Sequence, residues 1–251
     1  GKRDGMNSRE RVQAVLTGKP ADRLPVDFHF ADDTALQVFA GHYGMGEEEF
    51  LTYLENDVRH LYVMDEVELF LQNRPLMRYA FDHGFAYPNP EDPALCFDQW
   101  GIGWNMVSDG QLPVSSPLMD WDGLDKVQAP DPNRKENFYV VDTNIQGYID
   151  RNLAVDVAQY FGPFEKGYLI RGFEDFMMDM YEETEKVEIL LDRITQYRVE
   201  MAEEICQRGV TYGHSGDDFG TQGGPIMSLA LWRKLFKPRL EQIWSCLLYT
   251  S

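Results

Sequence analysis

The sequence is poor in cysteine and has no long apolar run. Its three cysteines (Cys96, Cys206 and Cys246) are odd in number and widely spaced, which fits neither a disulfide framework nor a CxxC metal site, so we expect reduced thiols. No stretch approaches the roughly 18 consecutive apolar residues that a membrane helix needs. The start, residues 1–11, is polar and lacks the apolar core of a signal peptide. These absences lead us to expect a cytoplasmic protein with no membrane segment.

Basic residues are also few. Lysine and arginine together number 23 against 42 acidic residues, which gives a formal net charge of −19. A field of that sign repels nucleic-acid phosphates and anionic lipid headgroups. We therefore do not expect nucleic acids or membrane surfaces as partners. We expect a small-molecule substrate instead.

Several common catalytic motifs are missing as well. The sequence contains no GxGxxG, GxxxxGK[ST], HExxH or GxSxG. At the level of motifs, this removes the dinucleotide-binding, phosphate-loop, zincin and serine-hydrolase interpretations.

The residues that are present predict alternating strands and helices. With 251 residues, 43% of them hydrophobic, the chain can bury the core of one barrel-sized domain. Apolar periodicity predicts strands at 24–30, 57–63, 154–160 and 210–216, and helices at 47–54, 137–151 and 184–208, with a further helix after Ser228. This alternation favours βα units and a parallel sheet.

The composition of the sequence changes between residues 66 and 132. Proline, glycine and aspartate recur there, and Trp100, Trp104 and Trp121 stand among short apolar pieces without helical spacing. We interpret this segment as an elaborated loop or small β insertion. Loops that follow barrel strands carry the chemistry of such folds, so the segment is a candidate contributor to a site.

A glycine-rich turn follows the strand predicted at 210–216. Residues 216–225 contain the adjacent carboxylates Asp217 and Asp218, and Gln222 lies a few residues further on. Glycines there let the backbone approach a ligand, and the carboxylates can bind polar groups or hold a proton. The alternative is a glycine-rich turn whose aspartates bond their own backbone amides.

A second candidate segment follows the strand predicted at 154–160. It contains Phe164, Glu165, Tyr168 and Arg171, of which Arg171 can clamp a carboxylate and Tyr168 can donate a hydrogen bond. The alternative is a helix start in which Arg171 pairs with a neighbouring acid, and the residues alone favour it. Among the scattered histidines, His29 and His214 stand out slightly because they lie near strand ends.

Several spaced motifs follow one another along the chain. They are Met6 to Val12, Gly18-Lys19-Pro20, Asp22 to Val26, Phe97-Asp98-Gln99-Trp100-Gly101, Arg171 to Phe176, Gly216 to Gln222 and Leu231 to Leu240. Together they resemble the uroporphyrinogen decarboxylase superfamily, in particular its uncharacterised and corrinoid methyltransferase-like branch, over residues 6–243. The resemblance implies an α/β fold, a (βα)8 TIM barrel that is incomplete at its C-terminal end. Residues 1–251 would then be one partial barrel domain, with 244–251 a non-native tail.

The resemblance implies two chemistries. True uroporphyrinogen decarboxylases use an N-terminal arginine-rich motif to neutralise a polycarboxylate, but the matching residues 28–33 contain no arginine. The methyltransferase branch uses zinc, held by a His-x-Cys motif and a later cysteine, to make a thiolate that attacks the methyl group of a corrinoid. Those ligands would lie beyond residue 243, so we expect no metal ligand within this chain, zinc only in a longer protein, and the corrinoid on a partner protein.

These considerations give a first hypothesis and two rivals. The first is methyl transfer between a corrinoid protein and a thiol or related acceptor; the rivals are decarboxylation of uroporphyrinogen or a related acid, and an inactive fragment or binding protein. The predicted catalytic residues are Asp217, Asp218 and Tyr168. The predicted substrate-binding residues are Glu165, Phe164, Gln222, His29, Arg171 and Trp100.

Overall fold

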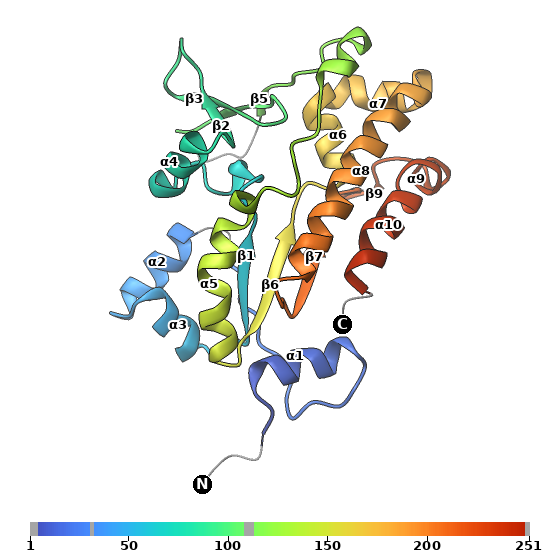
Figure 1. The fold of residues 1–251 in the computed structure, drawn as a ribbon. Coiled ribbons are helices and arrows are strands. Elements are labelled where there is room, and N and C mark those ends of the chain that lie inside the picture. The colour runs from blue at the N-terminus through green and yellow to red at the C-terminus, as the bar shows by residue number, and fades with distance from the viewer. Residues whose placement is uncertain (1–4, 31–32, 108–112, 249–251) are drawn as a thin grey trace.

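A three-stranded parallel sheet lies at the centre of the protein. The computed structural model describes residues 5–30, 33–107 and 113–248. Strands β1 (Val58–Tyr62), β6 (Ala154–Gln159) and β7 (Tyr212–Ser215) pair in the order β1-β6-β7 (Figure 1). Spatial order follows chain order, which is compatible with the winding of a (βα)8 barrel. The described residues contain three such strands, so the predicted barrel, incomplete at its C-terminal end, stays a prediction.

The structure agrees with most of the elements predicted from periodicity. The strands predicted at 57–63, 154–160 and 210–216 are confirmed as β1, β6 and β7. The helices before and between the strands of this sheet are α1 (Ser8–Leu16), α2 (Asp33–His42), α3 (Glu47–Tyr53), α5 (Tyr139–Asp150), α6 (Pro163–Arg171), α7 (Phe173–Glu182) and α8 (Thr184–Cys206). Among the described residues, no helix is long and apolar enough to cross a membrane.

The strand predicted at 24–30 is wrong. The segment is extended, but its polar groups bond to the residues that precede β1 and not to a strand ladder. Val26 N–H donates to the Asp57 carboxylate, and the Val26 carbonyl accepts from Asp57 N–H, both at 2.8 Å. Phe28 N–H donates to the Asn56 side chain at 2.8 Å. Side-chain acceptors thus replace strand pairing, yet they fix the segment beside the sheet.

The two faces of the sheet differ in chemistry. Val155 and Val157 of β6 are buried in the main core together with apolar residues of α5 and α8. The opposite face holds the alternating residues of each strand, including His60, Asp156 and His214. At the N-terminal ends of the strands, Val12 of α1 packs with Val58 and Ala154 in a small second cluster, with Tyr212 against it, and Figure 1 shows α1 beneath the sheet.

The segment 66–132 forms a small antiparallel sheet. After η1 (Val67–Leu69) and α4 (Arg74–Asp82), four strands pair in the order β2-β3-β4-β5. They are β2 (Ala86–Pro88), β3 (Leu95–Asp98), β4 (Gly103–Asn105) and β5 (Pro113–Ser115), and they precede η2 (Trp121–Lys126) and η3 (Lys135–Phe138). The buried Asp98 carboxylate accepts from Trp100 N–H, Ile102 N–H and the Trp104 indole, which fixes the tight turn between β3 and β4.

The region after β7 contains two helices where the sequence predicted one. A short hairpin, β8 (Gly220–Thr221) and β9 (Gly224–Pro225), leads to α9 (Leu229–Leu235) and α10 (Lys237–Leu248). Pro238 lacks the N–H that would continue the ladder of α9, so a new helix begins there. Helix α10 continues to Leu248, through most of the tail predicted at 244–251. Residues 249–251 of that tail lie outside the described residues.

Candidate functional site

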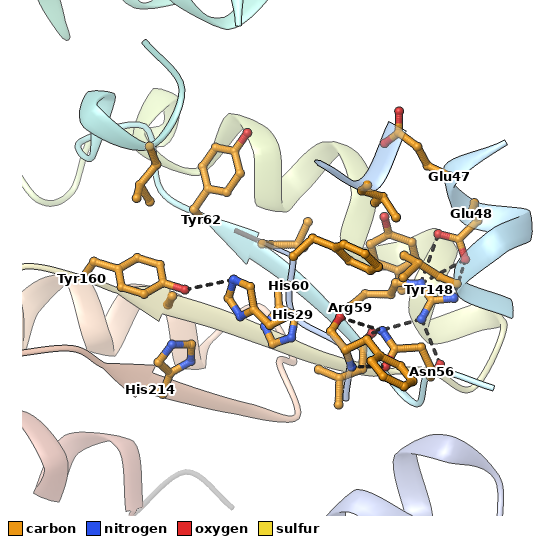
Figure 2. Close-up of a pocket in the computed structure, with 18 of the residues that line it drawn as sticks. His29, Glu47, Glu48, Asn56, Arg59, His60, Tyr62, Tyr148, Tyr160 and His214 are labelled. Carbon is orange, nitrogen blue, oxygen red and sulfur yellow. Dashed lines mark hydrogen bonds and ion pairs between the residues drawn. The ribbon is translucent and has the colours of Figure 1, made fainter. Parts of the chain in front are cut away.

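A cavity of about 760 Å³ lies against the polar face of the sheet. Its lining combines histidines and aromatic rings from the extended segment 24–30, from β1 and from the end of β6 (Figure 2). Its lining residues include Phe28, His29, Arg59, His60, Tyr160, Phe161 and His214. The site is thus assembled from segments far apart in the sequence.

His60 lies at the centre of the polar face, between two carboxylates. Its Nδ1 lies 2.8 Å from Asp156 Oδ2, and its Nε2 lies 2.7 Å from Asp27 Oδ1. Burial disfavours the imidazolium, but the hydrogen bonds to Asp156 and Asp27 outweigh burial and raise the pKa of His60 to about 9. The same pairing lowers the pKa of Asp27 against the opposing effect of burial. His60 is therefore a fixed cation at neutral pH, with both ring nitrogens occupied.

His214 shares the buried carboxylate of Asp156. Its Nδ1 lies 2.7 Å from the same Oδ2 that His60 contacts, while the Asp156 side chain is fully buried and that of His214 is 37% exposed. This contact has the distance of an ion pair but not the geometry of a hydrogen bond, unlike the contact of His60 with the same carboxylate. A carboxylate beside Nδ1 can nevertheless orient a histidine as a base that accepts a proton at Nε2.

His29 and Tyr160 complete the cluster. The His29 ring lies 4.2 Å from that of His60, and its Nε2 lies 3.4 Å from the Tyr160 hydroxyl. Burial and the neighbouring charge of His60 lower the pKa of His29. Burial raises the pKa of Tyr160 to about 12, so its hydroxyl stays protonated beside His29. The predicted site residue His29 therefore does line the cavity.

The one arginine among the described lining residues is already paired. Arg59 is 3% exposed, and its Nη2 donates to Glu48 Oε1 at 2.7 Å. Its Nη1 donates to the carbonyls of Asn56 and Val58. The guanidinium therefore holds α3 against β1 and is not free to neutralise a bound carboxylate.

The two candidate segments, the glycine-rich turn at 216–225 and the segment that begins α6, meet at the C-terminal ends of β6 and β7. Asp217 accepts from Phe164 N–H at 3.0 Å and from Glu165 N–H at 2.9 Å, and so caps the first turn of α6. Gly162 N–H donates to the Gly216 carbonyl at 2.8 Å. A Cβ at Gly162 would come within 2.6 Å of Asp217, so the close approach requires glycine. The turn at 216–225 and the start of α6 are one structural unit.

Burial raises the pKa values of several ionisable side chains in these two segments. Burial raises the pKa of Asp217 to about 7, although its two amide donors favour the anion. Burial also raises the pKa of Glu165, and it raises that of Tyr168 to about 12. Asp218 is exposed and accepts from Gly220 N–H at 3.0 Å. Asp218 thus bonds an amide of its own turn, as the alternative interpretation expected, whereas Asp217 bonds amides of α6. The catalytic role of both residues stays a prediction.

Three other predicted site residues lie away from the cavity. The Phe164 ring is 1% exposed and stacks on Phe219 at 5.3 Å, inside the core. Trp100 is 3% exposed, belongs to the β3–β4 turn, and meets the Tyr197 ring edge-on at 5.3 Å. Gln222 lies exposed in the β8–β9 turn. None of these three residues is among the described residues that line the cavity.

Arg171 follows the alternative proposed for it. Its guanidinium bonds Asp175 at 2.7 Å and Asp179 at 2.9 Å, and it also donates to the carbonyls of Leu118 and Met119. The side chain thereby joins α6, α7 and the segment after β5. With its donors committed in this way, Arg171 has no structural support as a substrate clamp.

Sequence reasoning missed His60, Asp156, Asp27 and Tyr160 as site residues. A signal was present, because three predicted strands each carry an ionisable residue near the middle: His60, Asp156 and His214. Neighbouring parallel strands bring such residues onto one face if the register allows it. The register pairs His60 with Asp156 and places His214 two positions further along.

The described residues do not form a metal site. Among them, no group of three or more His, Cys, Asp or Glu side chains is arranged to hold a metal ion. His60 and His214 each place Nδ1 on the same Asp156 oxygen, and the thiols of Cys96 and Cys206 are free. The zinc ligands that the resemblance implies, a His-x-Cys motif and a later cysteine, stay a prediction.

The buried groups predict a fall in stability at alkaline pH. Burial raises the pKa of Asp98 to about 7 and that of Glu66 to about 8, so these acids, like Asp217, bind a proton more tightly when folded. Their contribution, complete below pH 4, decreases as the pH rises through 7 to 8. The contribution of His60 is complete below its ordinary pKa of about 6.5 and disappears as the pH rises through about 9.

We expect the unfolding free energy to fall by at least about 2 kcal/mol between pH 5.5 and 8.5. Each tenfold difference in proton affinity between the folded and the unfolded chain corresponds to about 1.4 kcal/mol. Urea titrations across this range, with the transition slope checked at each pH, measure the change. A flat or rising profile would contradict the assignment of protonated buried acids.

The chain shares its family and its fold with known proteins. A search of the curated proteins finds no match. Among solved structures, the chain is similar to a methyltransferase from Methanosarcina mazei, with 16% identity and a TM-score of 0.64, over 96% of this chain and 67% of that one. That likeness concerns the fold. A family model described as uroporphyrinogen decarboxylase (URO-D) matches residues 7–247, which confirms the resemblance seen in the motifs. The chain therefore belongs to the uroporphyrinogen decarboxylase (URO-D) family.

Proposed function

We propose that this protein is a cytoplasmic enzyme that transfers a methyl group between a corrinoid carried by a partner protein and a thiol or related small acceptor. The observation that carries the proposal is the Asp156–His214 pair, 2.7 Å apart, at a cavity whose one described arginine is already paired. Family membership and the fold shared with a methyltransferase support it. We also infer that β1, β6 and β7 are strands of a (βα)8 barrel, because they follow chain order.

His214 would take the proton of the acceptor. A thiol attacks as its thiolate, so a base beside the sulfur is needed. Asp156 lies 2.7 Å from Nδ1 of His214, so Nε2 would accept the S–H proton. The sulfur–carbon bond then forms as the cobalt–carbon bond of the donor breaks, and the electron pair of that bond stays on cobalt.

Decarboxylation of uroporphyrinogen is less well supported by the cavity. Its polycarboxylate substrate needs several unpaired cations, because a protein of net charge −19 repels it. Arg59 is bound to Glu48, and His60 is held by two carboxylates. Neither side chain has capacity left for a substrate carboxylate.

Zinc remains part of the expectation from the resemblance. When bound, it would lower the pKa of the acceptor thiol. The described residues do not fit it, so we assign the removal of the proton to His214.

The proposal is tested by an anaerobic assay with free methylcobalamin as donor and 2-mercaptoethanesulfonate as acceptor, with and without added Zn²⁺. We expect thiol-dependent loss of the methylcobalamin spectrum and formation of the S-methyl product. Uroporphyrinogen is assayed in parallel for release of carbon dioxide. Carbon dioxide release without methyl transfer would overturn the proposal in favour of decarboxylation, and the absence of both activities would overturn it in favour of a non-enzymatic protein.

A further inference from the structure

A turn with unusual backbone geometry forms one wall of the cavity. Phe161 directly follows β6, lines the cavity, and has a φ of 52°, one of three non-glycine residues with positive φ in the described chain. A bulky aromatic residue rarely adopts this left-handed conformation without external restraint. The neighbouring residue, Tyr160, carries the hydroxyl that meets His29. The conformation of Phe161 thus affects the position of a side chain in the site.

The restraint comes from a buried arginine. Arg198 of α8 is 1% exposed, and its Nη2 donates to the Phe161 carbonyl at 3.0 Å. Its Nη1 donates to Glu66 Oε1, also at 3.0 Å, and Glu66 is fully buried. The planar guanidinium therefore joins the loop after β1 to the turn after β6, which a single point charge would not do with the same geometry.

A second buried pair holds the ring of the same residue. The Lys166 ammonium lies 5.5 Å from the centre of the Phe161 ring and 3.5 Å from Glu68 Oε1. Both side chains of this pair have no exposed surface. Gly162 N–H, next along the chain, donates to Gly216. The turn is thus fixed through its carbonyl, its ring and the following amide.

We propose that Arg198 is a positioning residue of this site, which holds Phe161 in its left-handed conformation and thereby sets the contact between Tyr160 and His29. It acts through the Phe161 carbonyl and does not touch the cavity itself. The inference rests on the proposed function only in taking the cavity as the active site. Its test needs no turnover, so it can fail independently of the assay for methyl transfer.

The test compares R198K with R193K by NMR of ¹⁵N-labelled histidine. Lysine keeps the charge beside Glu66 but cannot bond Glu66 and Phe161 together in one plane. Arg193 is a matched control because it also lies on α8 and its guanidinium also bonds the backbone, at the carbonyls of Leu124 and Val127 outside the cavity. We expect the His29 ring signals to move in R198K and to be unchanged in R193K.

Two further variants distinguish positioning from general destabilisation. In R198A, guanidinium below denaturing concentrations should restore the His29 signals, whereas ammonium at the same ionic strength should not. Glycine adopts the left-handed conformation without strain, so F161G combined with R198K should also bring the signals back toward those of F161G alone. His29 signals in R198K identical to those of the wild type would overturn the proposal, as would equal rescue by ammonium.

Discussion

Replacing His214 by glutamine is expected to lower kcat for methyl transfer by about 10²- to 10⁴-fold, the usual contribution of a positioned general base. Glutamine can still face Asp156 through its amide, but it cannot accept the proton of a thiol. Because binding of the acceptor does not require the base, KM should change much less than kcat. The measurement is the anaerobic methyl-transfer assay over a range of pH and acceptor concentration.

Two features make this prediction specific. His83→Gln is the matched control, since His83 lies after α4 and stacks on Tyr79 at 4.0 Å, away from the cavity; it should leave kcat unchanged. Replacing the thiol by a preformed thiolate at alkaline pH should recover part of the rate of H214Q. Wild-type kcat in the H214Q variant would remove His214 from the mechanism.

Replacing Asp156 by asparagine should lower the unfolding free energy by about 3 kcal/mol at pH 7, in the range for breaking a buried charge pair. The Asp156 carboxylate is fully buried and contacts both His60 and His214, so its loss leaves the His60 cation with Asp27 alone. The pKa of His60 should fall from about 9 toward its ordinary value. Urea unfolding and ¹⁵N-histidine NMR measure the two effects.

The pH dependence separates this effect from a packing defect. Above the pKa of His60 the wild type has lost the same ion pair, so the difference between D156N and wild type should shrink at pH 10. Asp142→Asn is the surface control: it breaks an exposed pair with Arg208 and should cost less than about 1 kcal/mol at any pH. A stability difference for D156N that stays constant with pH would contradict the assigned charge on His60.

The limits of sequence-based prediction are clearest in the candidate site. The glycine-rich turn and the start of α6, which the sequence analysis selected separately, lie together because both follow neighbouring parallel strands. The sequence could not predict that Asp217 caps α6, since this bond joins residues 52 and 53 positions apart. Arg171 illustrates the reverse case, because its partner Asp175 lies one helical turn away and the local pattern favoured an ion pair.

The sequence by itself determined the parallel strands, the long helix α8 and the family, because these depend on periodic apolar patterns and on motifs that are local in the chain. Only the tertiary structure decided which polar groups meet: His60 and Asp156 are 96 residues apart, and a strand register places them side by side. Likewise, segment 24–30 has the composition of a strand but bonds to the side chains of Asn56 and Asp57. Hydrophobic periodicity is read from a few adjacent residues, whereas register and side-chain partners depend on how distant segments pack.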